Sequence, residues 1–319
     1  MKAIIIYNQL SENPQADELD VLDQVEFVGK ALEKLGYEVV KLEFGFDIPK
    51  AISEIKKHNA NFIFNLVESI DNKGELIYFA PAILKYLKIP YCGVPLEGMF
   101  LTSNKVLTKQ FLRQNGISTP DLISYNEIEK IEKSKTYLFK PLWEDGSLGL
   151  DEENIFKGSD VDILEKIKTF PEKSFFIEEY IDGMEFNVSV LGSKNGAEVL
   201  PLAEICFIDF PENKPKIVGY TAKWNENSFE YKHTIRSFEF GKTNTPLIAE
   251  IKKLCIDCWN LFGLKGYARV DIRVDKNNKP YVLEINANPC ISPDSGFVAA
   301  TQEAGFDFTN VIKRIIEDI

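Results

Sequence analysis

The sequence contains little histidine: His58 and His233 are its only two in 319 residues. A zinc enzyme with several His ligands, or a hydrolase built on Ser, His and Asp, is difficult to assemble from so few. The five cysteines, an odd number, are typical of a reducing cytoplasm, and we expect a cytoplasmic protein. Cys255 and Cys258 have C-x-x-C spacing but fall within a helical pattern without a second pair, so we interpret them as core residues.

Long apolar runs and two common nucleotide-binding motifs are also missing. No apolar run is long enough to span a bilayer, and the start MKAIIIYNQL lacks the features of a cleaved signal peptide. No G-x-G-x-x-G follows the first predicted strand, and no G-x-x-x-x-G-K-[S/T] occurs. The net charge of −12 disfavours nucleic acid and anionic membranes as partners. Any phosphate-binding site must therefore be made positive locally.

The composition that is present, 45% hydrophobic and 27% charged residues, is typical of a globular protein of two or three domains. Apolar runs that predict strands alternate with helical periodicities at residues 2–7, 21–35, 38–42, 48–57, 61–65 and 76–84. This alternation predicts a parallel α/β unit. Ligands of such sheets bind at the carboxyl ends of strands, which makes residues 7–9 and 65–68 candidate site walls.

The stretch Gly266 to Pro289, GYARVDIRVDKNNKPYVLEINANP, alternates apolar and polar residues on both sides of a turn. It predicts an antiparallel hairpin. With the turn at 276–279, the carboxylate of Asp271 faces Glu284, and Arg269 faces Asn286. The same register places Val282 on the face of Glu284.

Two facing carboxylates repel each other unless a positive charge lies between them, so removal of Glu284 would relieve repulsion in a metal-free protein. Carboxylate and carboxamide oxygens suit Mg²⁺, which usually shares phosphate oxygens with a nucleotide. The alternative is an ordinary surface hairpin whose polar face meets water. Both interpretations remain open from spacing alone.

Lysines and a flexible loop precede this hairpin. Lys105 lies on a predicted helix capped by Thr102 and Ser103, although a helical lysine is ordinarily solvated. Lys140 ends a predicted strand, and the loop 144–149 that follows contains glycine and serine, whose N–H groups can bind phosphate. The irregular segment 207–235 is typical of a functional lid.

With these motifs in this order, the chain resembles the ATP-grasp superfamily and, within it, the D-alanine–D-alanine ligases. The motifs that carry the resemblance are KVLTK at 105–109, Lys140-Pro141 with its Gly-Ser loop, the hairpin 266–289, and Ser295-Gly296-Phe297. The resemblance implies an α/β and α+β ATP-grasp fold. It has an N-terminal parallel α/β domain (1–102), a central lobe (103–189) and a C-terminal lobe (190–319), with ATP between the two lobes.

The resemblance also implies roles, position by position. ATP and two Mg²⁺ ions are the implied cofactors, with Mn²⁺ as an alternative metal. Residues implied to bind the nucleotide are Lys105, Lys140, Glu144, Gly146, Ser147, Glu178, Glu179, Ile181, Glu185 and Lys223. The implied metal ligands are Asp271, Glu284 and Asn286, the catalytic residues Arg269, Ser147 and Lys223, and the substrate residues Glu68, Cys290, Ser295 and Gly296.

The regions that contact amino acids in this family differ here. Asn8 to Asn13 replaces a glycine-rich turn, and Asn65 to Ser69 replaces a His-Gly run. Cys290 stands where the family has a glycine, and Ser295-Gly296 where it has Ser-Leu. We expect an ADP-forming carboxylate–amine ligase with altered pockets for small amino-acid or peptide substrates, and the resemblance implies a homodimer. The alternatives are a genuine D-alanine–D-alanine ligase, a related ligase with another acyl donor, and a catalytically silent ATP-binding protein.

Overall fold

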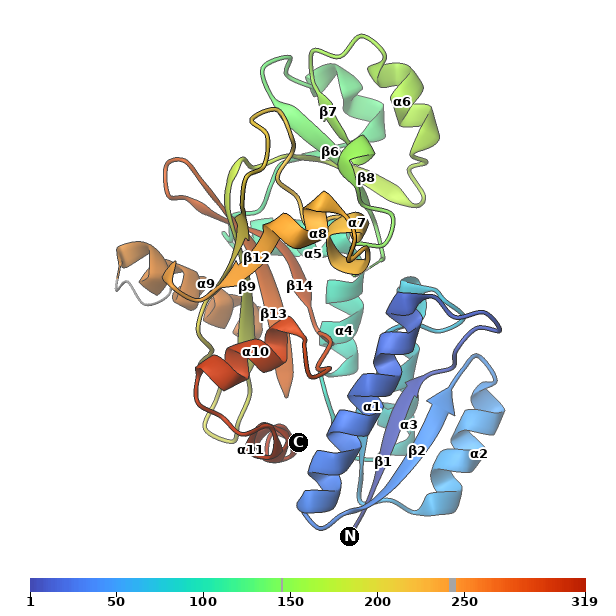
Figure 1. Ribbon diagram of the computed structural model, residues 1–319. Coiled ribbons are helices and arrows are strands. Elements are labelled where there is room, and N and C mark those ends of the chain that lie inside the picture. The colour runs from blue at the N-terminus through green and yellow to red at the C-terminus, as the bar shows by residue number, and fades with distance from the viewer. Residues whose placement is uncertain (145, 241–244) are drawn as a thin grey trace.

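The computed structural model describes residues 1–144, 146–240 and 245–319, so Asp145 of the expected phosphate loop lies outside the described residues. The described strands form three sheets, two of four strands and one of six. Figure 1 shows them as three bodies, coloured blue for the N-terminal one, green for the central one and yellow to red for the C-terminal one. The expected combination of a parallel α/β domain with two α+β lobes is confirmed.

The N-terminal body is a parallel sheet with strand order β2-β1-β3-β4. Its core strand is buried because Ala3 to Ile6 are all apolar, and α1 covers it with valines and a leucine spaced three and four residues apart. The elements are β1 (Lys2–Asn8), α1 (Ala16–Lys34), β2 (Glu38–Phe44), α2 (Ile48–His58), β3 (Phe62–Leu66), α3 (Phe79–Leu87), β4 (Tyr91–Cys92) and α4 (Leu96–Ser103).

The central body is an antiparallel sheet with strand order β5-β8-β6-β7. Its elements are α5 (Lys105–Gln114), β5 (Leu122–Ile123), β6 (Thr136–Pro141), β7 (Ile155–Lys157), α6 (Ile163–Thr169) and β8 (Phe175–Glu179). The expected cap of α5 at Thr102 and Ser103 is wrong, because α4 continues through both residues. Asn104 caps α5 instead, and its Oδ1 accepts from the Leu107 N–H at 2.9 Å.

The C-terminal body is the six-stranded sheet, with path β12-β11-β9-β13-β14 and β10 paired to β9. The segment 207–235 is not irregular throughout, because it contains two short helices. The elements are β9 (Gly183–Leu191), β10 (Glu198–Val199), β11 (Ala203–Phe207), α7 (Tyr220–Trp224), α8 (Phe229–His233), β12 (Thr234–Ser237), α9 (Pro246–Leu261), β13 (Tyr267–Asp275), β14 (Pro280–Asn286), α10 (Gly296–Glu303) and α11 (Phe308–Ile316). Cys255 and Cys258 of α9 are fully buried against this sheet, which confirms them as core residues.

The hairpin β13–β14 has the predicted register only at the end away from its turn. Asp271 pairs with Glu284 and Arg269 with Asn286, as predicted, but Ile272 pairs with Val282. This shift by one residue leaves Leu283 as the extra residue of a β-bulge. The expectation that Val282 shares the face of Glu284 is therefore wrong: the bulge turns Val282 into the apolar core with Ile272.

The expected boundary between residues 189 and 190 falls inside β9, which pairs with β13 from Gly183 to Leu191. A boundary inside a strand would divide one hydrogen-bonded sheet between two domains. We propose a boundary near Asp182 instead, because it keeps the central and C-terminal sheets whole. The division near residue 102 remains a prediction.

Candidate nucleotide and metal site

A cleft lies between the central and C-terminal sheets. Its non-protein space, counted with its open mouth, is about 770 Å³. It brings together most of the residues predicted for the nucleotide and the metal. These lining residues are Lys105, Lys140, Glu144, Ser147, Glu178, Glu179, Ile181, Glu185, Lys223, Arg269, Asp271 and Glu284.

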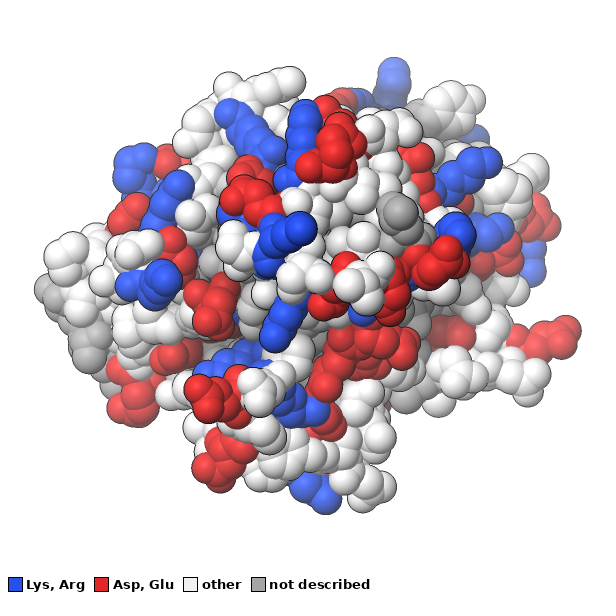
Figure 2. Space-filling view, turned by 90° about the horizontal axis from the view of Figure 1, so that it is seen from above, with Lys and Arg blue, Asp and Glu red and all other residues white. Residues whose placement is uncertain are grey.

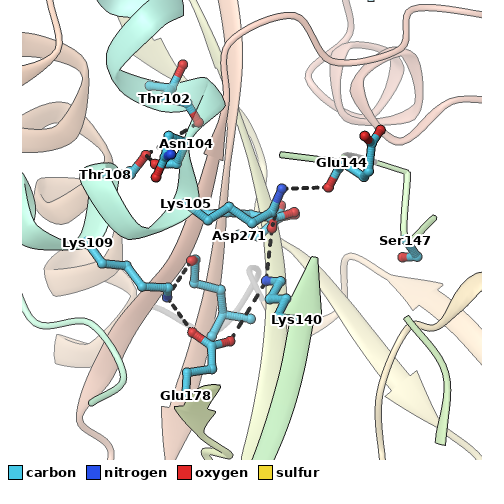
Figure 3. A network of polar contacts seen from close by, with 12 residues as sticks. Thr102, Asn104, Lys105, Thr108, Lys109, Lys140, Glu144, Ser147, Glu178 and Asp271 are labelled. Atoms are coloured by element: carbon cyan, nitrogen blue, oxygen red, sulfur yellow. Dashed lines mark hydrogen bonds and ion pairs between the residues drawn. The ribbon is translucent and has the colours of Figure 1, made fainter. Parts of the chain in front are cut away.

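Charged side chains from both lobes meet inside the cleft (Figure 3). Lys140 Nζ lies 2.9 Å from the Glu284 carboxylate and 4.0 Å from that of Glu178. Lys105 Nζ donates to the Glu144 carbonyl at 2.6 Å and lies 3.7 Å from Glu284. Both lysines are buried, so each positive charge depends on these oxygens.

The neighbouring charges keep this network ionised. Burial alone would raise the pKa of Glu284, but Lys140 and Lys105 hold that pKa well below its ordinary value. Burial alone would lower the pKa of Lys140, but Glu284 and Glu178 raise it above the ordinary lysine value. The two groups are therefore a carboxylate and an ammonium at neutral pH.

Lys109 is a site residue that we did not assign from the sequence. It is completely buried, its Nζ donates to the Leu283 carbonyl at 2.7 Å, and it lies 2.7 Å from the Glu178 carboxylate. Burial lowers the pKa of Lys109 to about 8, although the charge of Glu178 opposes that shift. Its position one helical turn after Lys105 was the available signal. Lys109 thus ties α5 to the bulge of β14 and to β8.

Two of the three predicted metal ligands, Asp271 and Glu284, line the cleft. Arg269 binds Asp271 in a bidentate manner, with Nε 2.7 Å from Oδ1 and Nη2 2.9 Å from Oδ2. Asn286 does not line the cleft, and its Oδ1 accepts from the Asn288 N–H at 3.0 Å. In the described ranges, no three His, Cys, Asp or Glu side chains gather to hold a metal by themselves. The oxygens of Asp271, Glu284 and Asn286 nevertheless fit Mg²⁺, which takes its remaining ligands from phosphate and water.

Arg273 is a second residue that we did not assign, although it alternates with Arg269 and Asp271 along β13. Its guanidinium is buried and lies 2.7 Å from the Glu185 carboxylate. It also donates to the carbonyl of Ile181 at 2.9 Å and to the carbonyl of Lys216. Arg273 therefore connects Glu185, which the resemblance assigns to the ribose, with Ile181, which it assigns to the adenine. It also connects both residues with the segment 207–235.

The two glutamates implied for the adenine point in different directions, because neighbouring side chains of a strand alternate. The Glu178 carboxylate is buried against Lys109 and Lys140. The Glu179 carboxylate pairs with Lys135 at 3.0 Å and is partly exposed. Both residues line the cleft, but Glu178 belongs to the ionic network.

The expected phosphate loop is bonded to the lid segment. Ser147 Oγ donates to the Val218 carbonyl at 2.6 Å, and Trp224 Nε1 donates to the Gly146 carbonyl at 3.1 Å. Ser147 adopts a left-handed φ of 65°, which is uncommon for a residue other than glycine. Gly146 itself does not line the cleft, whereas Ser147 and Lys223 do. These two bonds join the loop to the segment 207–235 at the cleft.

The comparison with protein families agrees with this geometry. Residues 111–317 match the family model described as "D-ala D-ala ligase C-terminus". The chain belongs to the D-alanine–D-alanine ligase family. It is an ADP-forming carbon–nitrogen ligase of the ATP-grasp type.

Curated relatives support the same membership along most of the chain. The D-alanine–D-alanine ligase of Rickettsia akari is 31% identical over 301 residues, which cover 92% of this chain and 85% of the relative. The D-alanine–D-alanine ligase of Carboxydothermus hydrogenoformans is 29% identical over 301 residues, which cover 90% and 89%. A solved structure of the Bacillus anthracis D-alanine–D-alanine ligase complexed with ATP has the same fold, with a TM-score of 0.73 at 21% identity, covering 100% of this chain and 96% of that one.

In this family member, the residues expected near the substrates lie outside the cleft. Gln24 of α1 links two of them: its Nε2 donates to Glu68 at 2.8 Å, and its Oε1 accepts from the Ile291 N–H, next to Cys290, at 3.1 Å. The Cys290 thiol donates to Asp20 Oδ2 at 2.9 Å. No sequence signal pointed to Asp20 and Gln24, because their helix α1 packs against this region only in the folded chain.

The thiol of Cys290 is not activated as a nucleophile. Burial and the negative charges of Glu68 and Asp20 raise its pKa above the ordinary cysteine value. A thiolate is the reactive form, and this environment disfavours it. Cys290 therefore acts as a hydrogen-bond donor to Asp20.

The other two expected substrate residues begin α10. Ser295 caps this helix, and its Oγ accepts from the Val298 N–H at 3.3 Å. Gly296 is the first helical residue and lies beside Arg236 of β12. None of the helices in the described ranges of this ligase is long and apolar enough to cross a membrane.

Proposed function

We propose that this ligase uses ATP and Mg²⁺ to convert a carboxylate into an acyl phosphate, which an amine then attacks. The observation that carries the proposal is the convergence of two buried lysines, two carboxylates and an arginine in one cleft. These residues are Lys105, Lys140, Asp271, Glu284 and Arg269.

The proposed reaction has two balanced steps. An oxygen of the substrate carboxylate bonds to the γ-phosphorus of ATP, the bond to the β–γ bridging oxygen breaks, and ADP leaves. The amine nitrogen then bonds to the acyl carbon, the bond from that carbon to the phosphate oxygen breaks, and the nitrogen loses a proton. An amide, ADP and phosphate are the products.

Residues of the cleft match the charges that these steps create. Lys105 and Lys140 would bind phosphate oxygens, since their charges are fixed at the floor of the cleft. Arg269 would stabilise the oxyanion that forms when the amine attacks, and Asp271 orients its guanidinium. Lys223 and Ser147 belong to the lid and the loop, which would exclude water from the acyl phosphate.

Asp271, Glu284 and Asn286 would hold Mg²⁺, with Mn²⁺ as an alternative. When bound, the metal offsets negative charge on the phosphates. Glu185 would contact the ribose, and Glu179 and Ile181 the adenine. Lys109 would act indirectly, by fixing the Glu178 carboxylate and the bulge before Glu284.

We further propose that the amino-acid pockets differ from those of D-alanine–D-alanine ligases. The Asp20–Cys290 hydrogen bond and the glycine at position 296 support this. The curated relatives named D-alanine–D-alanine ligase favour the main alternative, a genuine enzyme of that activity. A catalytically silent ATP-binding protein is the other alternative, but it has no evident use for an arginine held beside the metal carboxylates.

An ADP-release assay with ATP, Mg²⁺ and a panel of D- and L-amino acids and dipeptides tests these proposals. We expect amine-dependent ADP release with a substrate other than D-alanine. Rapid D-alanine-dependent turnover would refute the altered pockets. Thermal stabilisation by ATP–Mg²⁺ without any amine-dependent ADP release would favour the silent binding protein. The implied homodimer remains a prediction, which light scattering tests.

The distribution of charge on the molecular surface also agrees with small substrates. Figure 2 shows acidic and basic side chains interspersed over the face seen from above, without the single basic field that a nucleic-acid partner requires. This agrees with the net charge of −12.

A further inference from the structure

The carboxylate of Asp151, in the central body, binds the start of helix α7 in the segment 207–235. Asp151 Oδ1 accepts from the Thr221 N–H at 3.2 Å, and Oδ2 accepts from the Thr221 hydroxyl at 3.2 Å. The first N–H groups of a helix lack partners within the helix, so an oxygen acceptor placed there caps it. Gly219 precedes α7 and has no side chain to supply this bond. The cap of α7 therefore comes from a residue far away in the sequence.

The two segments approach so closely that the contact requires a glycine. The Tyr220 N–H donates to the Leu150 carbonyl at 2.7 Å. A Cβ atom on Gly219 would lie 2.5 Å from Asp151 Oδ1 and 2.8 Å from the Leu150 carbonyl oxygen. Because the second of these atoms belongs to the backbone, it cannot turn aside as a flexible side chain could. Gly219 therefore permits the contact through its lack of a side chain.

Asp151 is itself fixed to the strand that carries Lys140. Its N–H donates to Asn154 Oδ1 at 2.9 Å, and Asn154 Nδ2 donates to the Phe139 carbonyl at 2.9 Å. Asn154 is buried, and Phe139 directly precedes Lys140 on β6. These bonds give the carboxylate of Asp151 a defined position relative to β6.

An ion pair supports the same contact one residue further along the chain. Lys214 of the segment 207–235 pairs with Glu152 and, at 2.6 Å, with Glu230 of α8. Glu152 is exposed, so solvent screens its pair with Lys214. We therefore assign the anchoring of α7 to Asp151 and a supporting part to Glu152.

We propose that Asp151 is a positioning residue for the ligase reaction, because its cap on α7 holds Lys223 of that helix at the cleft. Lys223 and Lys140 line the same cleft from different bodies. The bonds of Asp151 and Asn154 connect the elements that carry these two lysines. This inference rests on the proposed function, in which Lys223 belongs to the lid that excludes water from the acyl phosphate.

Loss of the cap should therefore let water compete with the amine. In that side reaction a water oxygen bonds to the acyl carbon, and the bond from that carbon to the phosphate oxygen breaks. One proton of the water passes to the phosphate and the other to solvent. The original carboxylate and phosphate are released, so ATP is consumed without an amide being formed.

Limited proteolysis of the nucleotide-free, full-length protein tests the cap without any substrate. Trypsin cleavage at the lysines of the segment 207–235 reports its release from the central body. Asp151→Ala should speed this cleavage by about 10-fold, the effect of losing a helix cap and a second hydrogen bond, and should leave cleavage of the N-terminal body unchanged. Asp151→Asn keeps an acceptor for the Thr221 N–H and should stay close to wild type. Glu153→Ala, at an exposed neighbouring position, is the matched control.

The ratio of ADP to amide tests the role in the reaction. With an active carboxylate and amine, wild type should release equal amounts of both, whereas Asp151→Ala should release at least about twice as much ADP as amide. General damage to the fold would lower both equally. Gly219→Ala alters the other side of the contact and leaves the bond between Asp151 and Asn154 in place. It should reproduce both effects, and combining it with Asp151→Ala should add little.

Two results would overturn this inference and leave the ligase function intact. One is unchanged cleavage of the segment 207–235 in Asp151→Ala, and the other is an unchanged ratio of ADP to amide in that variant. Absence of amine-dependent ADP release by wild type with every substrate would instead overturn the proposed function. The role of Asp151 in the reaction would then be wrong as well, whatever the proteolysis shows.

Discussion

Lys140 and Glu284 form an ion pair across the cleft, with Nζ 2.9 Å from the carboxylate. Lys140 belongs to β6 of the central sheet and Glu284 to β14 of the C-terminal sheet. The same two side chains are those proposed to bind phosphate and metal. Under this proposal, binding of ATP and Mg²⁺ would exchange one set of charge partners for another without leaving either group unpaired.

Replacing Glu284 by alanine should abolish ligase activity and lower the melting temperature of the metal-free protein. The sequence alone suggested the opposite effect on stability, namely relief of carboxylate repulsion. The ion pairs reverse that expectation, because Glu284→Ala leaves the buried Lys105 and Lys140 without this carboxylate. A loss of about 3 kcal/mol is typical of a broken buried pair. Differential scanning calorimetry in EDTA measures it, with the exposed Glu153→Ala as control; an unchanged or higher melting temperature would contradict this account.

Acid should destabilise the wild-type protein partly through Glu284. The pKa of its carboxyl is held well below the ordinary value of 4.5 in the folded state. Its contribution to stability is therefore complete above pH 4.5 and is lost as the pH falls from there through the folded-state pKa. Denaturant unfolding from about pH 5 to about pH 3 should show a steeper loss for wild type than for Glu284→Gln. Equal slopes would show that the neighbouring lysines do not hold the pKa of Glu284 below its ordinary value.

Lys109→Met should weaken both the fold and nucleotide binding, although Lys109 does not line the cleft. Methionine keeps the apolar stem but leaves the buried Glu178 carboxylate without its nearest ammonium, which costs about 3–5 kcal/mol. Glu178 should then draw Lys140 away from the phosphates. Calorimetric titration with ATP and Mg²⁺ measures the affinity at a temperature where the variant is folded. Glu178→Gln combined with Lys109→Met should recover part of the stability, and failure to do so would argue against this pairing.

Arg273 should control discrimination at the ribose through Glu185. Arg273→Met releases the Glu185 carboxylate from its 2.7 Å contact and removes the bond to the lid carbonyl of Lys216. We expect weaker binding of ATP and a smaller preference for ATP over 2′-deoxy-ATP. Arg273→Lys keeps the charge and should retain more of that preference. If both nucleotides lose affinity equally in Arg273→Met, the arginine supports the fold without orienting Glu185.

The sequence predicted the paired strands and the chemistry on them because side-chain alternation is a local property. Asp271 faces Glu284 and Arg269 faces Asn286 as the pattern indicates. The register failed toward the turn, where Leu283 is extruded. Alternation cannot reveal a bulge whose carbonyl is held by Lys109 of a distant helix.

By itself, the sequence determined the parallel N-terminal sheet through its hydrophobic periodicity. The three-part fold and most residues of the cleft followed from the family resemblance that its motifs carry. Only the tertiary structure decided which charges meet. Lys109 with Glu178 and Arg273 with Glu185 are each contributed by different elements. Their pairing depends on how helices and strands pack in space, and a buried charge is stable only beside the partner that this packing provides.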